Sequence, residues 1–144
     1  MAGKMAEIGK WAVSCLLTGL ALLLAGPVLL GLRPRIVVSG AMEPAVPVGS
    51  LAYIRPSRDA EAVREGDVIV YQAGDSMTVL HRVICADAGD HSFVTIGDAN
   101  ETEDPGRISF AQYRGNLGFV IPLAGYLAAA LQQHRAAAAG LLAA

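Results

Sequence analysis

The sequence predicts a small, mainly β domain, antiparallel or mixed, that follows an N-terminal transmembrane helix and precedes an apolar C-terminal helical segment. Three observations lead to this prediction. Residues 11–32 are uncharged and mostly apolar, and the stretch that follows carries short β-branched runs separated by Gly, Pro and Asp. No long amphipathic helix pattern occurs between Ile36 and Asn116. A chain of 144 residues has room for one domain of ordinary size.

The apolar run from Trp11 to Leu32 predicts a membrane anchor. At about 1.5 Å per residue it covers roughly 33 Å, which is enough to cross the hydrocarbon of a bilayer. A cleavable secretory signal is the alternative, because Lys4 and Lys10 precede the run, but the apolar part of such a signal is normally only about 7 to 15 residues long. Residues 1–10 are then expected to form an N-terminal tail. Arg33 and Arg35 balance the two lysines, so charge does not fix the orientation of the anchor.

Residues 33–116 are expected to form the β-domain. Each predicted strand is rich in β-branched or aromatic residues, and most are flanked by Gly, Pro or Asp, which favour turns. The expected strands are residues 36–38, 50–54, 68–71, 77–84 and 92–96. Residues 58–64 could form a brief helical turn, and a polar loop follows Gly97.

Residues 117–144 are expected to form an apolar C-terminal segment. Leu117 to Leu131 is uncharged and mostly apolar. As a helix it would be about 22 Å long, which is short for a full crossing. Three interpretations stay open: a short or tilted second span, an interfacial segment, or a span cut off at the end of the given sequence. All three predict association with a membrane.

Charge and cysteine usage exclude some functions. Residues 33–116 contain 8 Lys or Arg and 12 Asp or Glu, so a nucleic-acid-binding surface is not expected. Cys15 lies in the apolar span and Cys85 in a predicted strand, so we expect no disulfide between them.

The residues suited to chemistry gather in three places. Ser39-Gly40-Ala41-Met42-Glu43-Pro44 follows a predicted strand, where catalytic loops are often found. His81 lies within a predicted strand, and an imidazole titrates near pH 6.5, which suits a general base and acid. Asp98 to Asp104 is an acidic loop that could orient such a histidine. Alanine at position 41 has no nucleophilic atom.

The hexad is similar to the Ser-Gly-Ser-Met-Glu-Pro signature of type I signal peptidases, membrane-anchored enzymes that cut signal peptides from secreted proteins. Position 41 carries Ala where that family has its nucleophilic Ser. Further blocks, 66–71, 81–83 and 97–100 with Asp104, resemble the family in order and approximate spacing. His81-Arg82-Val83 resembles the branch shared by the endoplasmic-reticulum enzyme, archaea and some Gram-positive bacteria.

The resemblance implies a role for each candidate site residue. Ala41 occupies the position of the nucleophile, His81 that of the base, and Asp104 that of its acidic partner, with Asp98 as a second acid that the family requires. Spacing alone leaves open which carboxylate of the loop meets the imidazole. Ser39 and Met42 are the candidate oxyanion and substrate-binding residues; the Ser39 hydroxyl and the Ala41 N–H would form the oxyanion hole. No metal and no cofactor are implied.

The function implied is that of a membrane-bound signal peptidase with an extracytoplasmic catalytic domain, present here in an inactive form. Its partners would be signal peptides of secreted preproteins and the lipid bilayer of a cell or endoplasmic-reticulum-type membrane, and other membrane subunits stay open. Two explanations of Ala41 compete: an engineered replacement of the nucleophilic Ser by Ala in an otherwise intact enzyme, or a natural non-catalytic protein that binds signal peptides or serves as a partner subunit. We favour the first, because His81 and the acidic loop are kept together.

Overall fold

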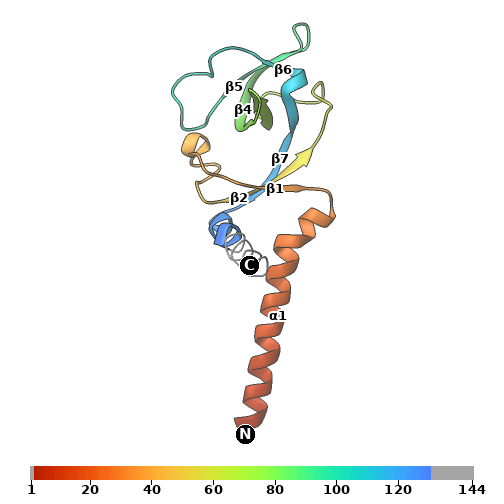
Figure 1. Ribbon diagram of the computed structural model, residues 1–144, viewed down its shortest axis with the longest axis vertical. Coiled ribbons are helices and arrows are strands. Elements are labelled where there is room, and N and C mark those ends of the chain that lie inside the picture. Colours follow the sequence, from red (N-terminus) through yellow and green to blue (C-terminus); the bar gives the residue numbers. More distant parts are fainter. Residues whose placement is uncertain (1, 131–144) are drawn as a thin grey trace, which may run out of the picture. The chain divides into compact units, whose positions relative to one another are not determined.

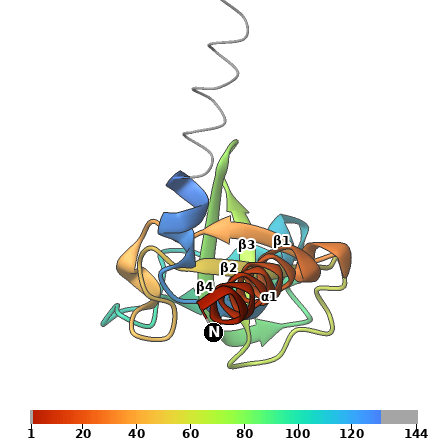
Figure 2. The ribbon, with the colours of Figure 1, turned by 90° about the horizontal axis from the view of Figure 1, so that it is seen from below.

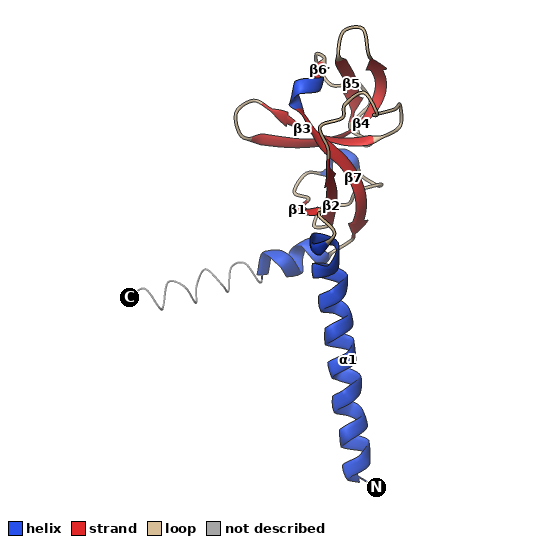
Figure 3. Ribbon diagram, turned by 90° about the vertical axis from the view of Figure 1, so that its right-hand side faces the viewer, coloured by secondary structure: helices blue, strands red, loops and turns tan. Residues whose placement is uncertain are grey.

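The computed structural model describes residues 2–130 and divides the chain into two compact units, Met1–Leu32 and Arg33–Ala144 (Figure 1). The first unit is a helix and the second is a β-domain. Figure 3 colours strands red and shows that the second unit consists of strands joined by loops, with very little helix. The prediction of a mainly β fold after an N-terminal apolar helix is confirmed.

Helix α1 runs from Ala2 to Leu29. Within it, Glu7–Leu29 is long and apolar enough to cross a membrane. Residues 2–10, expected as an N-terminal tail, are part of this helix, and Lys10 supports it there by pairing with Glu7 at 3.0 Å. The helix ends where Gly31 adopts a φ of +84°, with Gly31 N–H bonded to Val28 and Leu32 N–H to Pro27.

One antiparallel sheet makes up the β-domain. Its strands follow the spatial order β1-β2-β7-β3-β4-β5-β6, so β1 forms one edge and β6 the other. Figure 2 shows β1 beside β2. All of the pairings are antiparallel. The strands are β1 (Arg33–Ile36), β2 (Leu51–Pro56), β3 (Val68–Ala73), β4 (Met77–Asp87), β5 (Ser92–Ile96), β6 (Ile108–Ser109) and β7 (Tyr113–Ile121).

The first strand begins and ends earlier than expected. β1 stops at Ile36, and Val37 lies beyond it, where its N–H donates to Ser50 and its carbonyl accepts from Gly49. These bonds satisfy its backbone without extending the ladder, and Val38 is 84% exposed. Residues 58–64 are irregular, with one turn at residues 61–62 in place of the expected helical turn.

The C-terminal boundary of the domain also differs from the prediction. Leu117 to Ile121 belong to β7, not to an apolar helical segment. They are apolar because they pack in the sheet: Leu117 lies against a buried cluster, and Phe119 stacks on Tyr53 with ring centroids 4.7 Å apart. Residues 124–130 are helical, and residues 131–144 of the predicted C-terminal segment lie outside the described part of the chain.

Two buried clusters hold the sheet together. The larger packs aromatic and β-branched side chains of β3, β4, β5 and β7; Phe93 is fully buried, with its ring centroid 4.5 Å from that of Phe110. The smaller consists of Ala52, Ile54 and Val70, flanked by Leu80 and Leu117. Each fully buried large apolar side chain stabilises the fold by roughly 1.5–3 kcal/mol, so the clusters fix the positions of β3 and β4.

Candidate active site

A short 3-10 helix, η1 (Gly40–Met42), presents Ala41 after β1. Ser39 caps this turn: its side-chain oxygen accepts a 3.3 Å hydrogen bond from the Ala41 N–H. Met42 is only 2% exposed, and its carbonyl accepts from the Val46 N–H at 2.8 Å. Met42 therefore anchors the turn to the domain while Ala41 stays partly exposed.

The loop that follows β5 is fastened to this turn. The Ala99 N–H donates to the Ala41 carbonyl at 2.9 Å. Gly97 lies so close that a Cβ there would come within 2.5 Å of the same carbonyl oxygen. The two segments are far apart in sequence, so this backbone contact sets the place of Ala41 relative to the acidic loop.

His81 and Asp104 meet in the folded domain. His81 lies in β4 opposite Ile69 of β3, and its Nδ1 contacts Asp104 Oδ2. Their side chains are 12% and 13% exposed, so little water competes for the contact. A proton on Nδ1 directed at the carboxylate leaves the lone pair of Nε2 free to act as a base.

Two further side chains hold the Asp104 carboxylate. Thr95 is fully buried in β5, and its hydroxyl donates to Asp104 Oδ2 at 2.6 Å, while its backbone carbonyl accepts from the Asp104 N–H at 2.8 Å. The Tyr71 hydroxyl reaches the same oxygen at 3.5 Å, and its ring meets the His81 ring edge-on with centroids 6.3 Å apart. Burial raises the pKa of Tyr71, which keeps its phenol protonated and able to donate.

Sequence reasoning missed Thr95 and Tyr71. The sequence offered part of the signal for Tyr71, because alternation along the predicted strand puts Ile69 and Tyr71 on one face, and the structure then pairs Ile69 with His81. Thr95 offered a weaker signal, a polar residue in an otherwise mostly apolar strand.

Asp98 does not contact His81 directly; it pairs with the neighbouring residue, Arg82. The guanidinium Nε and Nη2 donate to the two Asp98 oxygens at 2.8 and 2.6 Å, and Nη1 donates to the Gly66 carbonyl at 2.7 Å. The hydrogen bonds from Arg82 lower the pKa of the Asp98 carboxyl, and the pKa of Arg82 is raised in return. This fork fixes the start of the acidic loop to β4.

Ala41 and His81 line one groove of about 580 Å³. Its walls are mostly apolar and come from β1, β2, β3, β4 and the loop before η1. The other lining residues are Arg35, Ile36, Val37, Val38, Ser39, Met42, Ala52, Ile54, Val70, Ser76, Met77, Thr78, Val79 and Leu80. The arrangement offers an extended apolar chain a place to lie beside a histidine whose Nε2 has no hydrogen-bond partner among residues 2–130.

Comparison with known proteins gives a consistent result. The chain is 35% identical to signal peptidase I W of Bacillus subtilis over 99 residues, which cover 67% of this chain and 52% of that protein. It is 39% identical over 75 residues to the signal peptidase complex catalytic subunit SEC11C of Homo sapiens, 49% of this chain and 38% of that protein. The SEC11 subunit of Clavispora lusitaniae is 40% identical over 72 residues, 48% of this chain and 42% of that protein. The chain belongs to the type I signal peptidase family.

The family relationship rests on these relatives, because no protein-family model matches the chain. The chain spans about half the length, or less, of the type I signal peptidases named above. The structure brings Ser39, Ala41, Met42 and His81 to one groove and Asp104 to His81, and it places Asp98 on Arg82. The roles that signal peptidase resemblance assigns to these residues stay predictions.

Proposed function

We propose that this chain is a membrane-anchored signal peptidase held in an inactive state by Ala41, and that it retains the ability to bind signal peptides. One observation carries the proposal: the Asp104-bound His81 and Ala41 line the same apolar groove. A largely buried carboxylate–imidazole pair beside an apolar groove is the apparatus that a hydroxyl nucleophile needs.

With Ser at position 41, His81 can act as the general base, because a proton on Nδ1 leaves Nε2 unprotonated. The Ser Oγ gives its proton to His81 Nε2 and attacks the carbonyl carbon of the scissile peptide, forming a tetrahedral oxyanion. The intermediate collapses as the C–N bond breaks, and Nε2 returns the proton to the leaving amine. Water then hydrolyses the acyl-enzyme with the same base. Asp104 stabilises the imidazolium through Nδ1 in both steps.

Oxyanion stabilisation would come from the Ser39–Ala41 turn. The Ala41 N–H donates to Ser39 Oγ over a long 3.3 Å in this state. An oxyanion is a stronger acceptor than a hydroxyl, so it can take over this N–H, and the Ser39 hydroxyl can rotate to donate as well. Both donors are independent of the side chain at position 41.

Membrane anchoring is assigned to α1, and the extracytoplasmic side to the β-domain. Trp11 and Leu16 are each about 70% exposed on the helix. A bilayer would bury such apolar side chains at no cost in unsatisfied polar groups. The side of the membrane follows from the substrate, because a signal peptide is cut after its preprotein has entered the export path.

The decisive experiment is the Ala41→Ser variant of the full chain, reconstituted in liposomes with a preprotein that carries an Ala-x-Ala cleavage site. The chain as written should show no turnover, since loss of the nucleophile in such a unit costs on the order of 10⁶ in turnover. The variant should release the signal peptide, and adding His81→Ala should abolish release. His91→Ala is the matched control, because His91 is exposed and does not line the groove. A correctly folded Ala41→Ser protein that cuts none of several preproteins contradicts the proposal.

A natural non-catalytic binder or partner subunit is the second candidate, and Ala41 itself is the observation that favours it. This candidate predicts equal signal-peptide affinity for the Ala41 and Ser forms and cleavage by neither. Measuring binding and cleavage on the same two proteins separates the candidates.

A further inference from the structure

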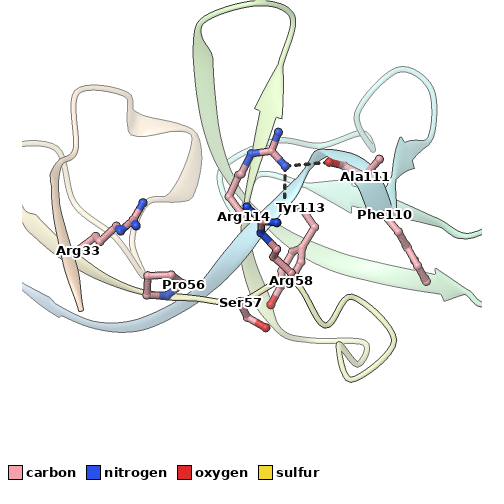
Figure 4. Close-up of a pocket in the computed structure, with 8 residues that line it drawn as sticks. All are labelled: Arg33, Pro56, Ser57, Arg58, Phe110, Ala111, Tyr113 and Arg114. Atoms are coloured by element: carbon pink, nitrogen blue, oxygen red, sulfur yellow. Dashed lines mark hydrogen bonds between the residues drawn. The ribbon is translucent and has the colours of Figure 1, made fainter. Parts of the chain in front are cut away.

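Four arginines from three separate segments of the chain gather at one end of the β-domain. Together they form a basic patch: Arg33, Arg35, Arg58 and Arg114. Two cavities of about 680 and 170 Å³ lie among them, and both are lined by Arg33, Pro56 and Arg114. Figure 4 shows the larger cavity, with Arg33 from β1, Arg58 from the segment after β2 and Arg114 from β7.

The charge of the basic patch is not compensated within the described residues. No Asp or Glu lines either cavity, and none of the four arginines takes part in an ion pair among residues 2–130. In the described part of the chain Arg114 bonds only to neutral oxygens, those of Ala111, Tyr113 and the Gln72 side chain. Arg82 and Arg107, by contrast, are each paired with aspartate.

This concentration of positive charge is not a result of the overall composition. The domain carries more acidic than basic residues, so four exposed arginines at one end mean that positive charge is concentrated there in an otherwise acidic domain. Arginine binds phosphate through two parallel N–H···O bonds, and exposed, uncompensated guanidinium groups from several segments suit a phosphate ligand.

The short connection between α1 and Arg33 determines which phosphate groups the basic patch can reach. Arg33 follows the end of α1, at Leu29, by four residues, which span at most about 14 Å. The headgroup layer on each side of the hydrocarbon is roughly 5–8 Å thick. If α1 crosses a bilayer, Arg33 therefore lies in or next to the headgroups, whichever side the domain occupies.

We propose that the basic patch binds the phosphate of an anionic phospholipid headgroup. The patch is continuous with the candidate active site, because Arg35 lines both the smaller cavity and the groove that contains Ala41 and His81. Headgroup binding at the patch holds the mouth of the groove at the membrane surface, where a membrane-inserted peptide emerges. The binding itself does not depend on catalysis.

The test uses the full chain in zwitterionic detergent micelles, titrated with short-chain phosphatidylglycerol, short-chain phosphatidylcholine and inorganic phosphate. We expect saturable binding of phosphatidylglycerol and at least tenfold weaker binding of the other two. Arg33→Gln/Arg58→Gln removes two charges without removing any described hydrogen bond. Because each arginine near an anionic surface contributes roughly fivefold, this variant should weaken phosphatidylglycerol binding by about 25-fold.

Two matched controls isolate the patch. Arg107→Gln removes one positive charge that lines neither cavity and is paired with Asp87, so it should leave the affinity unchanged. Lys4→Gln/Lys10→Gln removes the basic residues at the other end of α1 and should also leave it unchanged. Equal affinity for phosphatidylglycerol in the native chain and in Arg33→Gln/Arg58→Gln overturns the proposal. Inorganic phosphate binding as tightly as the lipid overturns it as well, because the lipid is then not the ligand.

Discussion

The hydroxyl of Thr95 donates a 2.6 Å hydrogen bond to the same oxygen of Asp104 that contacts His81. The backbones of the two residues are also joined, by the Asp104 N–H and the Thr95 carbonyl. Thr95 in β5 thus holds both the backbone and the side chain of Asp104 in position for the contact with the imidazole. Asp104 lies in a loop, but its bonds to Thr95 in β5 fix it as the partner of His81 in the neighbouring strand β4.

Thr95→Val tests this arrangement. It keeps the shape of the side chain and removes the donor to Asp104, and a lost hydrogen bond to a charged group destabilises a fold by roughly 1.5–3 kcal/mol. We expect that loss in the free energy of unfolding, measured by denaturant titration. In the Ala41→Ser protein we also expect kcat to fall on the order of tenfold with KM unchanged, because Asp104 supports the imidazolium only as it forms. Thr102→Val, at an exposed loop position, should change neither quantity, and an unchanged kcat in Thr95→Val would show that Thr95 is not needed to position Asp104.

The Arg82–Asp98 fork makes stability depend on acid pH. Arg82 lowers the pKa of Asp98 in the folded domain, so the stabilisation is fully present above the ordinary carboxyl pKa of about 3.9 and is lost as pH falls from there toward the lowered folded value. Asp98→Asn should therefore destabilise the domain at pH 7 and make its unfolding free energy less dependent on pH below about pH 4. Thermal unfolding at several pH values measures both effects. Asp75→Asn, an exposed change in the hairpin between β3 and β4, is the control, and a pH dependence identical in both variants would contradict the prediction.

Gly97 is required because of the Ala41 carbonyl. A Cβ at position 97 would lie 2.5 Å from that oxygen and 2.8 Å from the Asn100 side-chain nitrogen, so Gly97→Ala must push a backbone segment aside. We expect a loss of roughly 1–3 kcal/mol of stability, and in the Ala41→Ser protein a loss of most cleavage activity. Gly40→Ala is the matched comparison in the nucleophile loop itself, where the nearest atom would be 3.6 Å away. Equal stability of the two variants would mean that the two loops are not held together as described.

Ser50 carries a buried hydroxyl that has no hydrogen-bond partner in the described part of the chain, and the residue is 0% exposed. Burying such a group costs free energy, so Ser50→Ala should stabilise the domain by about 1 kcal/mol. Ser92→Ala should do the opposite, because the nearly buried Ser92 hydroxyl accepts from Arg107 at 3.2 Å. Calorimetric midpoints of the two variants test the pair, and a destabilised Ser50→Ala protein would indicate that the hydroxyl has a partner in solution.

The family and the types of residue at the site could be predicted from the sequence, because both are recognised from residues that lie close together along the chain. The length of the apolar run predicted α1, and β-branched runs bounded by turn residues predicted β2 to β5. The hexad from Ser39 to Pro44 predicted the nucleophile loop. The sequence misplaced residues 117–121, because an uncharged apolar run looks the same whether its partner is lipid or a neighbouring strand. Only the pairing of Leu117 with Ile54 and the stacking of Phe119 on Tyr53 distinguish the two environments.

The sequence by itself determined that this protein has an apolar helix followed by a β-domain, that a histidine and several acids are available, and that position 41 lacks a nucleophilic atom. The tertiary structure decided which acid meets the histidine. Asp98 and Asp104 are equivalent by spacing, but Arg82 takes the first and leaves the second to His81, Thr95 and Tyr71. The physical reason is that a hydrogen bond depends on ångström-scale geometry between strands, which the order of residues along one strand does not specify.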